Sequence, residues 1–328
     1  MKAIQLKAFG NPAEAVQLAE VPDTSAPAPD EVVVALEASP INGTDLLIIA
    51  GRYGFLPPLP SILGVEGVGR VVAVGTGIKH LKEGDRTLVP MLQPAWAERI
   101  KTRATWLRPL PKADIDQLSM LGINPATAYL LLTDIVQLKP GDWVIQNGAN
   151  SATARAVIPI AKSLGIRTVN VVRRPELVSE IKALGGDVVL VDGPDLPKRV
   201  AAETDKAPIA LAIDMVGDSS TLNLMNTLAN DGVAVVYSAM SGKPLLGTGP
   251  GMIFRNLSVR GFWLFNWYKT ATPDKLTMMY EHLAPMIASG AIIAPIAGVY
   301  GFDQYPQALA AAAKFGGKVI LKPAQGTS

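Results

Sequence analysis

The chain has 328 residues, of which 49% are apolar and 18% charged, a balance that excludes disorder because enough apolar surface exists to offset chain entropy. Thirty Lys and Arg against 28 Asp and Glu leave a formal net charge of +2, whereas a general nucleic-acid binder carries a larger basic excess. This length exceeds what one hydrophobic core usually supports, so we expect two domains.

The sequence contains no cysteine and only two histidines, His80 and His282. Without cysteine, disulfides, thiolate nucleophiles and cysteine-ligated zinc or iron–sulfur sites are impossible. His80 lies in a polar loop and His282 in an amphipathic helical pattern, so both are interpreted as surface or helix-face residues. We expect no metal site.

The sequence pattern also predicts neither a targeting segment nor a membrane span. The first six residues alternate like a strand, which leaves no room for a signal or transit peptide. The long uncharged run 283–302 is broken by Pro285, Gly290 and Pro295, so it does not predict a membrane span. These features predict a cytoplasmic protein with no membrane association.

Residues 1–120 predict a β-rich domain. Apolar runs at 31–37 and 69–75 are bounded by Pro, Asp or Gly, the usual punctuation of strands. Because few helical patterns separate such runs, we expect a partly closed β domain.

From residue 121 onward, apolar strands alternate with helices. This alternation indicates an α/β domain with a parallel sheet and helices on both faces, and right-handed crossovers make the sheet doubly wound. A helix at 273–289 and strands near 292–297 and 318–322 are expected to rejoin the first domain. The prediction is thus a catalytic domain at 1–120 and 266–328 and a cofactor domain at 121–265. Within the latter we expect strands at 143–146, 168–172, 188–191, 209–215 and 233–238, and helices at 154–164 and 175–184.

The first strand-to-helix turn of the predicted sheet is a candidate phosphate site. In a doubly wound sheet the ligand lies at the carboxyl ends of the strands, where strand order reverses. The turn contains Gly148 and several small residues, which let a diphosphate approach the backbone N–H groups. A compact turn with Ser151 as helix N-cap explains the same residues, so both interpretations stay open.

The end of the second strand is more informative. NAD-binding folds place an acidic residue there and NADP-binding folds an arginine. This chain has Arg173 and Arg174, whose guanidinium groups suit a 2′-phosphate by charge-assisted pairing. The alternative is two solvated arginines, but the helix dipole disfavours cations at a helix start. We therefore expect NADPH as the cofactor.

Three glycine-containing stretches form a framework outside this region: Gly-Val-Glu-Gly-Val-Gly-Arg-Val-Val-Ala-Val-Gly at 64–75, Lys-Glu-Gly-Asp-Arg at 82–86, and 317–323. With this framework the chain resembles the medium-chain dehydrogenase/reductase superfamily over nearly its whole length. The zinc alcohol dehydrogenases of that superfamily carry a histidine metal ligand in the first stretch, where this chain has Val65. The resemblance therefore implies the zinc-independent branch, with a GroES-like catalytic domain and a Rossmann cofactor domain.

Four further stretches narrow the resemblance: Gly-Arg-Tyr-Gly-Phe-Leu-Pro-Pro-Leu-Pro at 51–60, 122–129, 144–147, and 257–264 with its Phe-Trp-Leu ending. They are similar to the trans-2-enoyl-thioester reductases, the NADPH-dependent enzymes of fatty acid synthesis. This likeness implies Tyr53 as catalytic tyrosine, and a homodimer. The NADPH contacts that it implies are Asn124, Asn150, Ser151, Ala152, Thr153, Arg173, Arg174, Tyr237, Ser238, Ala239, Met240, Phe262, Trp263, Leu264, Phe265 and Lys318.

The chain departs from this family in three places. Ala152 and Ala154 stand where glycine is usual, so phosphate contact there is expected to be looser. Asn42, a candidate for substrate binding, and Asp45 are kept, but a Gly–Thr pair replaces Pro–Ser between them. Eukaryotic members carry a mitochondrial presequence and this chain has none, which favours a bacterial-type cytoplasmic form.

The implied reaction reduces the C2=C3 bond of an enoyl thioester carried by CoA or an acyl carrier protein. Hydride delivered to the β-carbon builds enolate charge on the thioester oxygen, and the α-carbon then needs a proton. A phenol with a pKa of about 10 can donate to that oxygen and supply the proton, without a metal. Tyr53 lies in a Gly- and Pro-rich loop that would let it meet a substrate, although a packing tyrosine is the alternative.

The aromatic run 262–268 is interpreted as a strand, whose consecutive residues point to opposite faces. One face, with Phe262 and Leu264, would line an apolar acyl slot, and the other would pack against a dimer partner or the interdomain core. Trp96 is a further candidate for substrate contact, although a core tryptophan fits equally well.

Two other functions stay open. A quinone or enone reductase uses the same fold and would turn over simple quinones but not thioesters. A non-catalytic NADPH-binding relative is supported by the alanine-substituted turn. Acyl chain length and the choice between CoA and carrier protein are not distinguished by the sequence.

Overall fold

The computed structural model describes residues 1–91, 93–314 and 316–324. The chain divides into two compact units, Met1–Ala126 with Phe265–Ser328, and Thr127–Leu264. The sequence had put the divisions after residues 120 and 265, so that residues 121–126 and Phe265 change sides. Residues 315 and 325–328 of the predicted catalytic domain lie outside the described residues.

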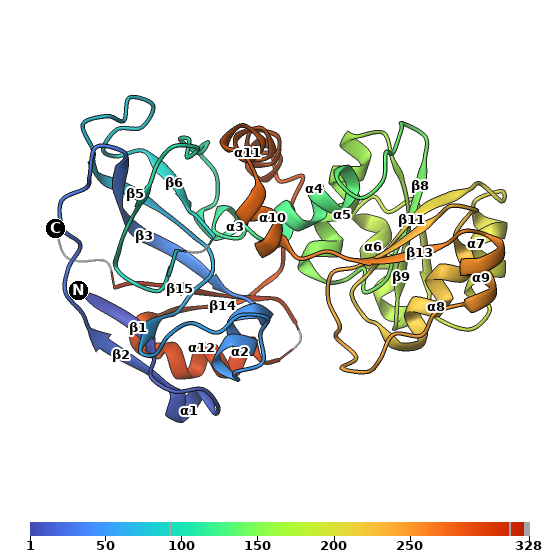
Figure 1. The fold of residues 1–328 in the computed structure, drawn as a ribbon, viewed down its shortest axis with the longest axis horizontal. Coiled ribbons are helices and arrows are strands. Elements are labelled where there is room, and N and C mark those ends of the chain that lie inside the picture. The colour runs from blue at the N-terminus through green and yellow to red at the C-terminus, as the bar shows by residue number, and fades with distance from the viewer. Residues whose placement is uncertain (92, 315, 325–328) are drawn as a thin grey trace. The chain divides into compact units, whose positions relative to one another are not determined.

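The first unit is built around one long strand, β3. It pairs antiparallel with β5, β7 and β15, and β15 pairs parallel with β14. A small separate sheet has the order β2-β1-β4. The strand near the C-terminus thus lies beside strands from the first hundred residues (Figure 1), as the sequence predicted for 318–322. The strands are β1 (Lys2–Leu6), β2 (Val16–Glu20), β3 (Glu31–Ile41), β4 (Ser61–Ile62), β5 (Gly67–Val74), β6 (Arg86–Val89), β7 (Arg99–Arg103), β14 (Ile296–Gly301) and β15 (Lys318–Lys322).

Most helices of this unit are short, and α12 packs on β14 and β15. Only α11 among the described helices of this unit exceeds ten residues, and its N-cap Thr272 accepts a hydrogen bond from the Lys275 backbone N–H. The helices are α1 (Pro12–Ala15), α2 (Gly43–Ile49), α3 (Ile115–Leu118), α4 (Asn124–Thr133, which continues into the second unit), α10 (Leu264–Thr270), α11 (Pro273–Ala288), and α12 (Tyr305–Ala312) after a 3₁₀ turn at Phe302–Gln304.

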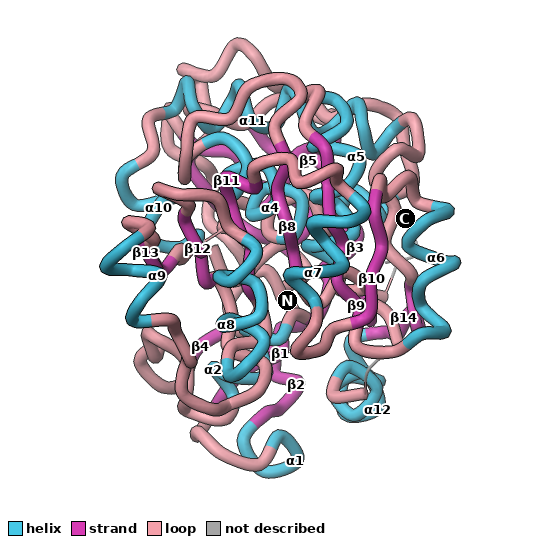
Figure 2. The backbone as a smooth tube through the Cα atoms, turned by 90° about the vertical axis from the view of Figure 1, so that its right-hand side faces the viewer, coloured by secondary structure: helices cyan, strands magenta, loops and turns pink. Residues whose placement is uncertain are grey.

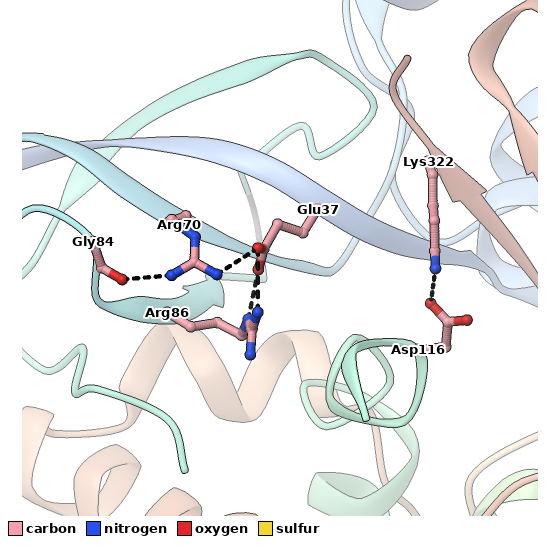
Figure 3. Close-up of polar contacts among 6 residues, drawn as sticks. All are labelled: Glu37, Arg70, Gly84, Arg86, Asp116 and Lys322. Atoms are coloured by element: carbon pink, nitrogen blue, oxygen red, sulfur yellow. Dashed lines mark hydrogen bonds and ion pairs between the residues drawn. The ribbon is translucent and has the colours of Figure 1, made fainter. Parts of the chain in front are cut away.

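An ion network ties three strands of this unit together (Figure 3). Glu37 on β3 accepts from Arg86 on β6 at 2.5 Å and from Arg70 on β5 at 3.0 Å, and Arg70 also donates to the Gly84 carbonyl. Burial alone would raise the pKa of Glu37, but the two guanidinium groups outweigh it and lower that pKa. The network therefore links β3, β5 and β6 at the position of Glu37.

The second unit contains a six-stranded sheet in the order β10-β9-β8-β11-β12-β13, with every neighbouring pair parallel. Counted from β8 this order is 3-2-1-4-5-6, the doubly wound order, so the predicted fold class is confirmed. Strand order reverses between β8 and β11. The elements are β8 (Trp143–Gln146), α5 (Ala152–Ser163), β9 (Arg167–Val172), α6 (Val178–Ala183), β10 (Val188–Val191), α7 (Leu196–Glu203), β11 (Ile209–Asp214), α8 (Asp218–Thr227), β12 (Val233–Val236), α9 (Gly249–Phe254) and β13 (Ser258–Gly261).

Each face of this sheet buries its own apolar cluster. Val171 packs with residues of α7 and α8, whereas the next residue, Val172, packs with residues of α5 and α6. This is the alternation that a strand imposes on successive side chains. Figure 1 shows α5 and α6 on one side of the sheet and α7 and α8 on the other, and in Figure 2 α7 and α8 lie in front. The strands are apolar on both faces because helices cover both.

Three expected elements differ from the structure. The strand near 292–297 begins only at Ile296, since Pro295 has no N–H for a ladder. The helix at 175–184 is a 3₁₀ turn, Pro175–Leu177, followed by α6. The aromatic run 262–268 is not a strand, because β13 ends at Gly261 and α10 begins at Leu264. A short apolar run fits either period, so only packing decides.

No helix within the described residues is both long and apolar enough to cross a bilayer.

Candidate functional site

Asn42, Asn124 and Lys318, which are far apart in the sequence, meet in one buried cluster of the first unit. The strand register brings two of them together, because Val319 on β15 pairs with Ile41 on β3 and Lys318 therefore falls opposite Asn42. Lys318 donates to Asn42 Oδ1, which also accepts from Asn124 Nδ2 at 3.4 Å. Asn124 begins α4, so the helix start sets its position.

Two carboxyl groups complete this cluster. Glu66 accepts a 2.8 Å hydrogen bond from Asn42 Nδ2, and Asp45, one helical turn after Asn42, accepts from the Asn42 backbone N–H at 2.8 Å. Glu66 is 1% exposed and Asp45 0%. One oxygen of each, Glu66 Oε2 and Asp45 Oδ1, has no hydrogen-bond partner among the described residues. Such groups are costly to bury in charged form.

The charges of the cluster are interdependent. Burial raises the pKa of Glu66 and of Asp45 to about 7, with Lys318 acting against the shift in both. Burial lowers the pKa of Lys318, and Glu66 and Asp45 oppose that change. The two buried acids therefore titrate near neutral pH, and their charges favour the protonated form of Lys318.

Tyr268 on α10 lies at the edge of this cluster. It is 9% exposed, and its hydroxyl has no partner among the described residues. Burial raises the pKa of Tyr268 well above its usual value, and the Glu66 charge adds to the shift. Trp106 packs edge-on to its ring, with the centroids 6.4 Å apart.

Tyr53 follows α2, at the opposite end of that helix from Asn42. Its ring meets Phe55 edge-to-face with centroids 5.3 Å apart, and Phe55 stacks on Phe265 at 4.3 Å. Lys269 lies over the Phe265 ring, with Nζ 4.7 Å from its centroid. A loop that looks mobile in sequence is thus tethered to α10 through aromatic contacts, and Tyr53 is half-buried.

The second unit has a glycine-containing turn between β8 and α5. Gly148 has φ +56°, and a Cβ there would lie 2.3 Å from Met215 Sδ, so no larger side chain fits without displacement. Ser151 Oγ caps α5 by accepting from the Ala154 N–H at 3.2 Å. Asn150 is exposed and Ala152 and Thr153 form the first turn of the helix. Backbone N–H groups at this helix start can meet an anion.

A buried polar network holds the facing turn between β11 and α8. Asp214 accepts from Asn147 Nδ2 at 2.6 Å, from the Val216 and Gly217 N–H groups at 2.8 and 3.0 Å, and from Thr221 Oγ1 at 2.5 Å. Asn147 follows β8 and Asp214 ends β11. The two strands between which the order reverses are therefore tied together at their carboxyl ends.

The remaining predicted cofactor contacts lie at the ends of β9 and β12. Arg173 and Arg174 are exposed, Arg174 lies 3.6 Å from Glu176, and Arg173 forms no ion pair within the described residues. Burial raises the pKa of Tyr237 strongly, partly offset by the Ser151 hydroxyl, and Ser238, Ala239 and Met240 continue into an increasingly exposed loop. These side chains surround the carboxyl edge where doubly wound sheets bind ligands.

Two family models match the chain. One described as "Alcohol dehydrogenase GroES-like domain" covers residues 28–123, and one described as "Zinc-binding dehydrogenase" covers residues 153–279. The mitochondrial enoyl-[acyl-carrier-protein] reductase of Rattus norvegicus is 37% identical over 326 residues, which cover 96% of this chain and 86% of the relative. The chain belongs to the enoyl reductases of the medium-chain dehydrogenase/reductase superfamily.

Solved structures agree with this enoyl reductase assignment. The complex of Etr1p, an enoyl thioester reductase of Candida tropicalis, with NADP and crotonyl-CoA has a TM-score of 0.85 and 26% identity, covering 98% of this chain and 99% of that one. A quinone oxidoreductase of Pseudomonas syringae has a TM-score of 0.82 and 28% identity, covering 98% and 99%.

The structure corrects one predicted substrate contact of this enoyl reductase. Trp96 is 0% exposed and donates through Nε1 to Ser39 Oγ at 3.0 Å, so it is a core residue. Gly64 makes room for it, since a Cβ there would lie 2.3 Å from Trp96 Cδ1. The indole therefore has no surface to offer a substrate.

The aromatic run also needs correction. In a helix, Leu264, Phe265 and Tyr268 share the buried face, at the i, i+1 and i+4 spacing, so faces do not alternate as in a strand. Leu264 is 6% exposed, whereas Phe262 and Trp263 precede the helix and are half-buried. The argument that grouped Phe262 and Leu264 on one strand face is therefore wrong.

Sequence reasoning missed Glu66, Asp45 and Tyr268 as members of the site. A signal for Glu66 was present, because a lone acid inside the apolar run 64–75 needs a buried partner. No group of three or more His, Asp or Glu side chains that could hold a metal occurs in the part of the chain that the structure describes. His80 Nε2 lies 2.8 Å from the Ala104 carbonyl.

The raised pKa of Asp45 gives a pH dependence of unfolding. Because the folded state binds this proton more tightly than the unfolded chain, Asp45 stabilises the fold below about pH 4 and that contribution is lost as the pH rises through 7. We expect Asp45→Asn to gain about 2–4 kcal/mol on the parent between pH 4 and 8, since one pKa unit is worth about 1.4 kcal/mol. Urea unfolding across that range measures it.

The control for Asp45 is Asp116→Asn. Asp116 pairs with Lys322 at 2.6 Å outside the cluster (Figure 3), so this variant removes a carboxyl group without touching the two buried acids. Parallel pH curves for Asp45→Asn and the parent would contradict the assignment.

Proposed function

We propose that this enzyme reduces the C2=C3 bond of trans-2-enoyl thioesters with NADPH. The observation that carries the proposal is Tyr53, a phenol held half-buried on the Phe55–Phe265 stack in a chain that belongs to the enoyl reductases. Because the chain belongs to this family, it is an oxidoreductase. The alternative of a non-catalytic NADPH-binding protein therefore loses its support.

The residues of the second unit suit NADPH. The Gly148 turn and the Ser151-capped start of α5 offer N–H groups to a diphosphate. Arg173, with no ion pair among the described residues, and Arg174 offer guanidinium groups to a 2′-phosphate. Tyr237 adds a buried hydroxyl. When bound, NADPH supplies the hydride that reaches the β-carbon.

The chain's own residues have two tasks in this reaction. As the β-carbon gains hydride, negative charge builds on the thioester oxygen, and the Tyr53 hydroxyl donates a hydrogen bond to that oxygen. The α-carbon then needs one proton, which Tyr53 supplies and regains from solvent. Lys318 and Asn42 lie at the other end of α2 and contribute a positive charge and an amide to the same unit. The half-buried Phe262 stays a candidate for acyl contact.

The proposed reaction is zinc-independent. The chain has no cysteine and has Val65 in the slot of a zinc ligand, although one matching family model is named for zinc binding. A conjugated thioester is electrophilic enough to accept hydride when its oxygen is hydrogen-bonded. Reduction of a quinone or enone is the second candidate, and it is favoured by the likeness to quinone oxidoreductase structures.

A homodimer is the proposed assembly. β13 is an edge strand of the six-stranded sheet, and on the preceding helix α9 Ile253 and Phe254 are 75% and 81% exposed. An unpaired edge beside apolar side chains is typical of a surface that joins a second copy. The cytoplasmic location stays a prediction from the sequence, and the curated relatives are named as mitochondrial.

Tyr53→Phe tests the proton donor. We expect kcat/KM for crotonyl thioester to fall by about 100-fold or more, the usual size of general acid catalysis, with NADPH binding unchanged. NADPH oxidation followed by absorbance measures it, with and without a chelator. Tyr300→Phe, on β14, is the matched control and should retain activity. Full activity of Tyr53→Phe would reject the role, and turnover of quinones without thioesters would favour the second candidate.

The double variant Arg173→Ala with Arg174→Ala tests the cofactor. We expect KM for NADPH to rise about tenfold or more and KM for NADH to stay within about twofold, because only the 2′-phosphate is lost as a partner. Arg167→Ala, at the other end of β9, should keep the parent's preference. An unchanged NADPH/NADH ratio in the double variant would show that the arginines do not read the phosphate.

Ile253→Asp with Phe254→Asp tests the assembly. Two buried charges at a dimer interface are costly, so we expect monomers in sedimentation velocity while the parent sediments as a dimer. Met278→Asp, on α11 and 67% exposed in the parent, is the control and should remain dimeric. A dimeric double variant would place the interface elsewhere.

A further inference from the structure

Glu66 has no role in the proposed reaction, yet it is hydrogen-bonded to a residue of the candidate site. At 1% exposure its carboxyl cannot touch a substrate. Its Oε1 accepts from Asn42 Nδ2 at 2.8 Å, and Asn42 Oδ1 accepts from Lys318, which is half-buried. A chain of two hydrogen bonds therefore runs from the Glu66 carboxyl group through the Asn42 amide to the Lys318 ammonium group.

The surroundings of Glu66 are built to keep a carboxyl there. Its backbone carbonyl accepts from Ser39 Oγ at 2.6 Å. Gly122 leaves space for the side chain, since a Cβ at that position would lie 3.1 Å from Glu66 Oε2. An apolar residue of similar size is often as stable as a buried ion pair or more so. Stability alone thus gives no reason for an acid at this place.

We propose that Glu66 is a positioning residue for the reductase, which orients the Asn42 amide and, through it and by its charge, keeps Lys318 protonated and pointed at one place in the site. This inference rests on the proposed function for its kinetic effect, but the state of Lys318 itself can be measured without turnover.

The groups that face Glu66 fix the sign of the effect. They are Asp45 from α2, Lys318 from β15, Tyr268 from α10 and the amide of Asn42. Burial lowers the pKa of Lys318, and among the described residues Glu66 and Asp45 oppose that change. Removing the Glu66 charge leaves Asp45 alone, so Lys318 loses its proton at lower pH.

Glu66→Gln tests this, because it keeps an oxygen for the Asn42 amide and removes the charge. Competitive acetylation of the cofactor-free protein, read by mass spectrometry, gives the pH at which the Lys318 amine becomes reactive, with Lys322 on the same strand as internal reference. We expect the Lys318 midpoint to fall by about one pH unit and that of Lys322 to stay, since a single adjacent charge shifts a buried group by one unit or more.

Kinetics provide the second readout. In Glu66→Gln we expect kcat for crotonyl thioester to fall about tenfold at pH 8, and the alkaline limb of its pH profile to move down by about one unit, with KM within about twofold. Glu66→Asp keeps the charge and should restore the limb. The double variant Lys318→Met with Glu66→Gln should be no slower than Lys318→Met alone, because Glu66 acts through Lys318. Asp274→Asn, which changes an exposed acid on α11, should change neither readout.

An unmoved Lys318 midpoint in Glu66→Gln overturns the inference even if the enzyme reduces enoyl thioesters normally. If the parent reduces no thioester, the proposed function fails, and the labelling midpoint still decides the role of Glu66. Should Glu66→Gln not fold, Glu66→Met removes the same charge with an apolar residue of similar size, and the same downward shift is required of it.

Discussion

The burial of two carboxyl groups beside a single lysine is the constraint on which the β-rich unit depends. Ionised groups in an apolar interior cost several kcal/mol each unless they are paired and hydrogen-bonded. The pairing of β15 with β3 provides the partner, because their register sets Lys318 opposite Asn42. The strand near the C-terminus is therefore needed for the electrostatics of residues in the first third of the chain as well as for the sheet.

The second unit also buries a carboxyl group, but it satisfies that group with hydrogen bonds from neutral donors. Asp214, buried at the end of β11, is satisfied by backbone N–H groups and by the Asn147 amide from the neighbouring strand. A carboxylate with this many donors fixes the turn it caps. The carboxyl edge of the sheet is thus rigid where strand order reverses, while Arg173 and Arg174 stay exposed at its side. A hydrogen-bonded turn with exposed guanidinium groups beside it is suited to an anionic ligand.

Individual residues could be found from the sequence where their chemistry is local. Arg173 and Arg174 follow a predicted strand, so neighbours along the chain were enough to single them out. Tyr53 was named because its Gly- and Pro-rich loop resembles that of the enoyl reductases. Glu66 and Tyr268 were missed because their importance comes from partners that are distant in sequence. For Trp96 the sequence left substrate contact and the core both open, for the related reason that its burial depends on Ser39 and Gly64. The run 262–268 was misread because short apolar runs satisfy the periods of both strand and helix.

The sequence by itself determined the doubly wound sheet, the lack of cysteine chemistry and the family framework, because hydrophobic period, composition and contiguous motifs are properties of the chain. It named Asn42, Asn124 and Lys318 separately. Only the tertiary structure decided that these three share hydrogen bonds with one another and with a buried acid, and that Trp96 belongs to the core. Register between strands about 280 residues apart is set by packing of the whole unit, and desolvation acts on a side chain only once that packing exists.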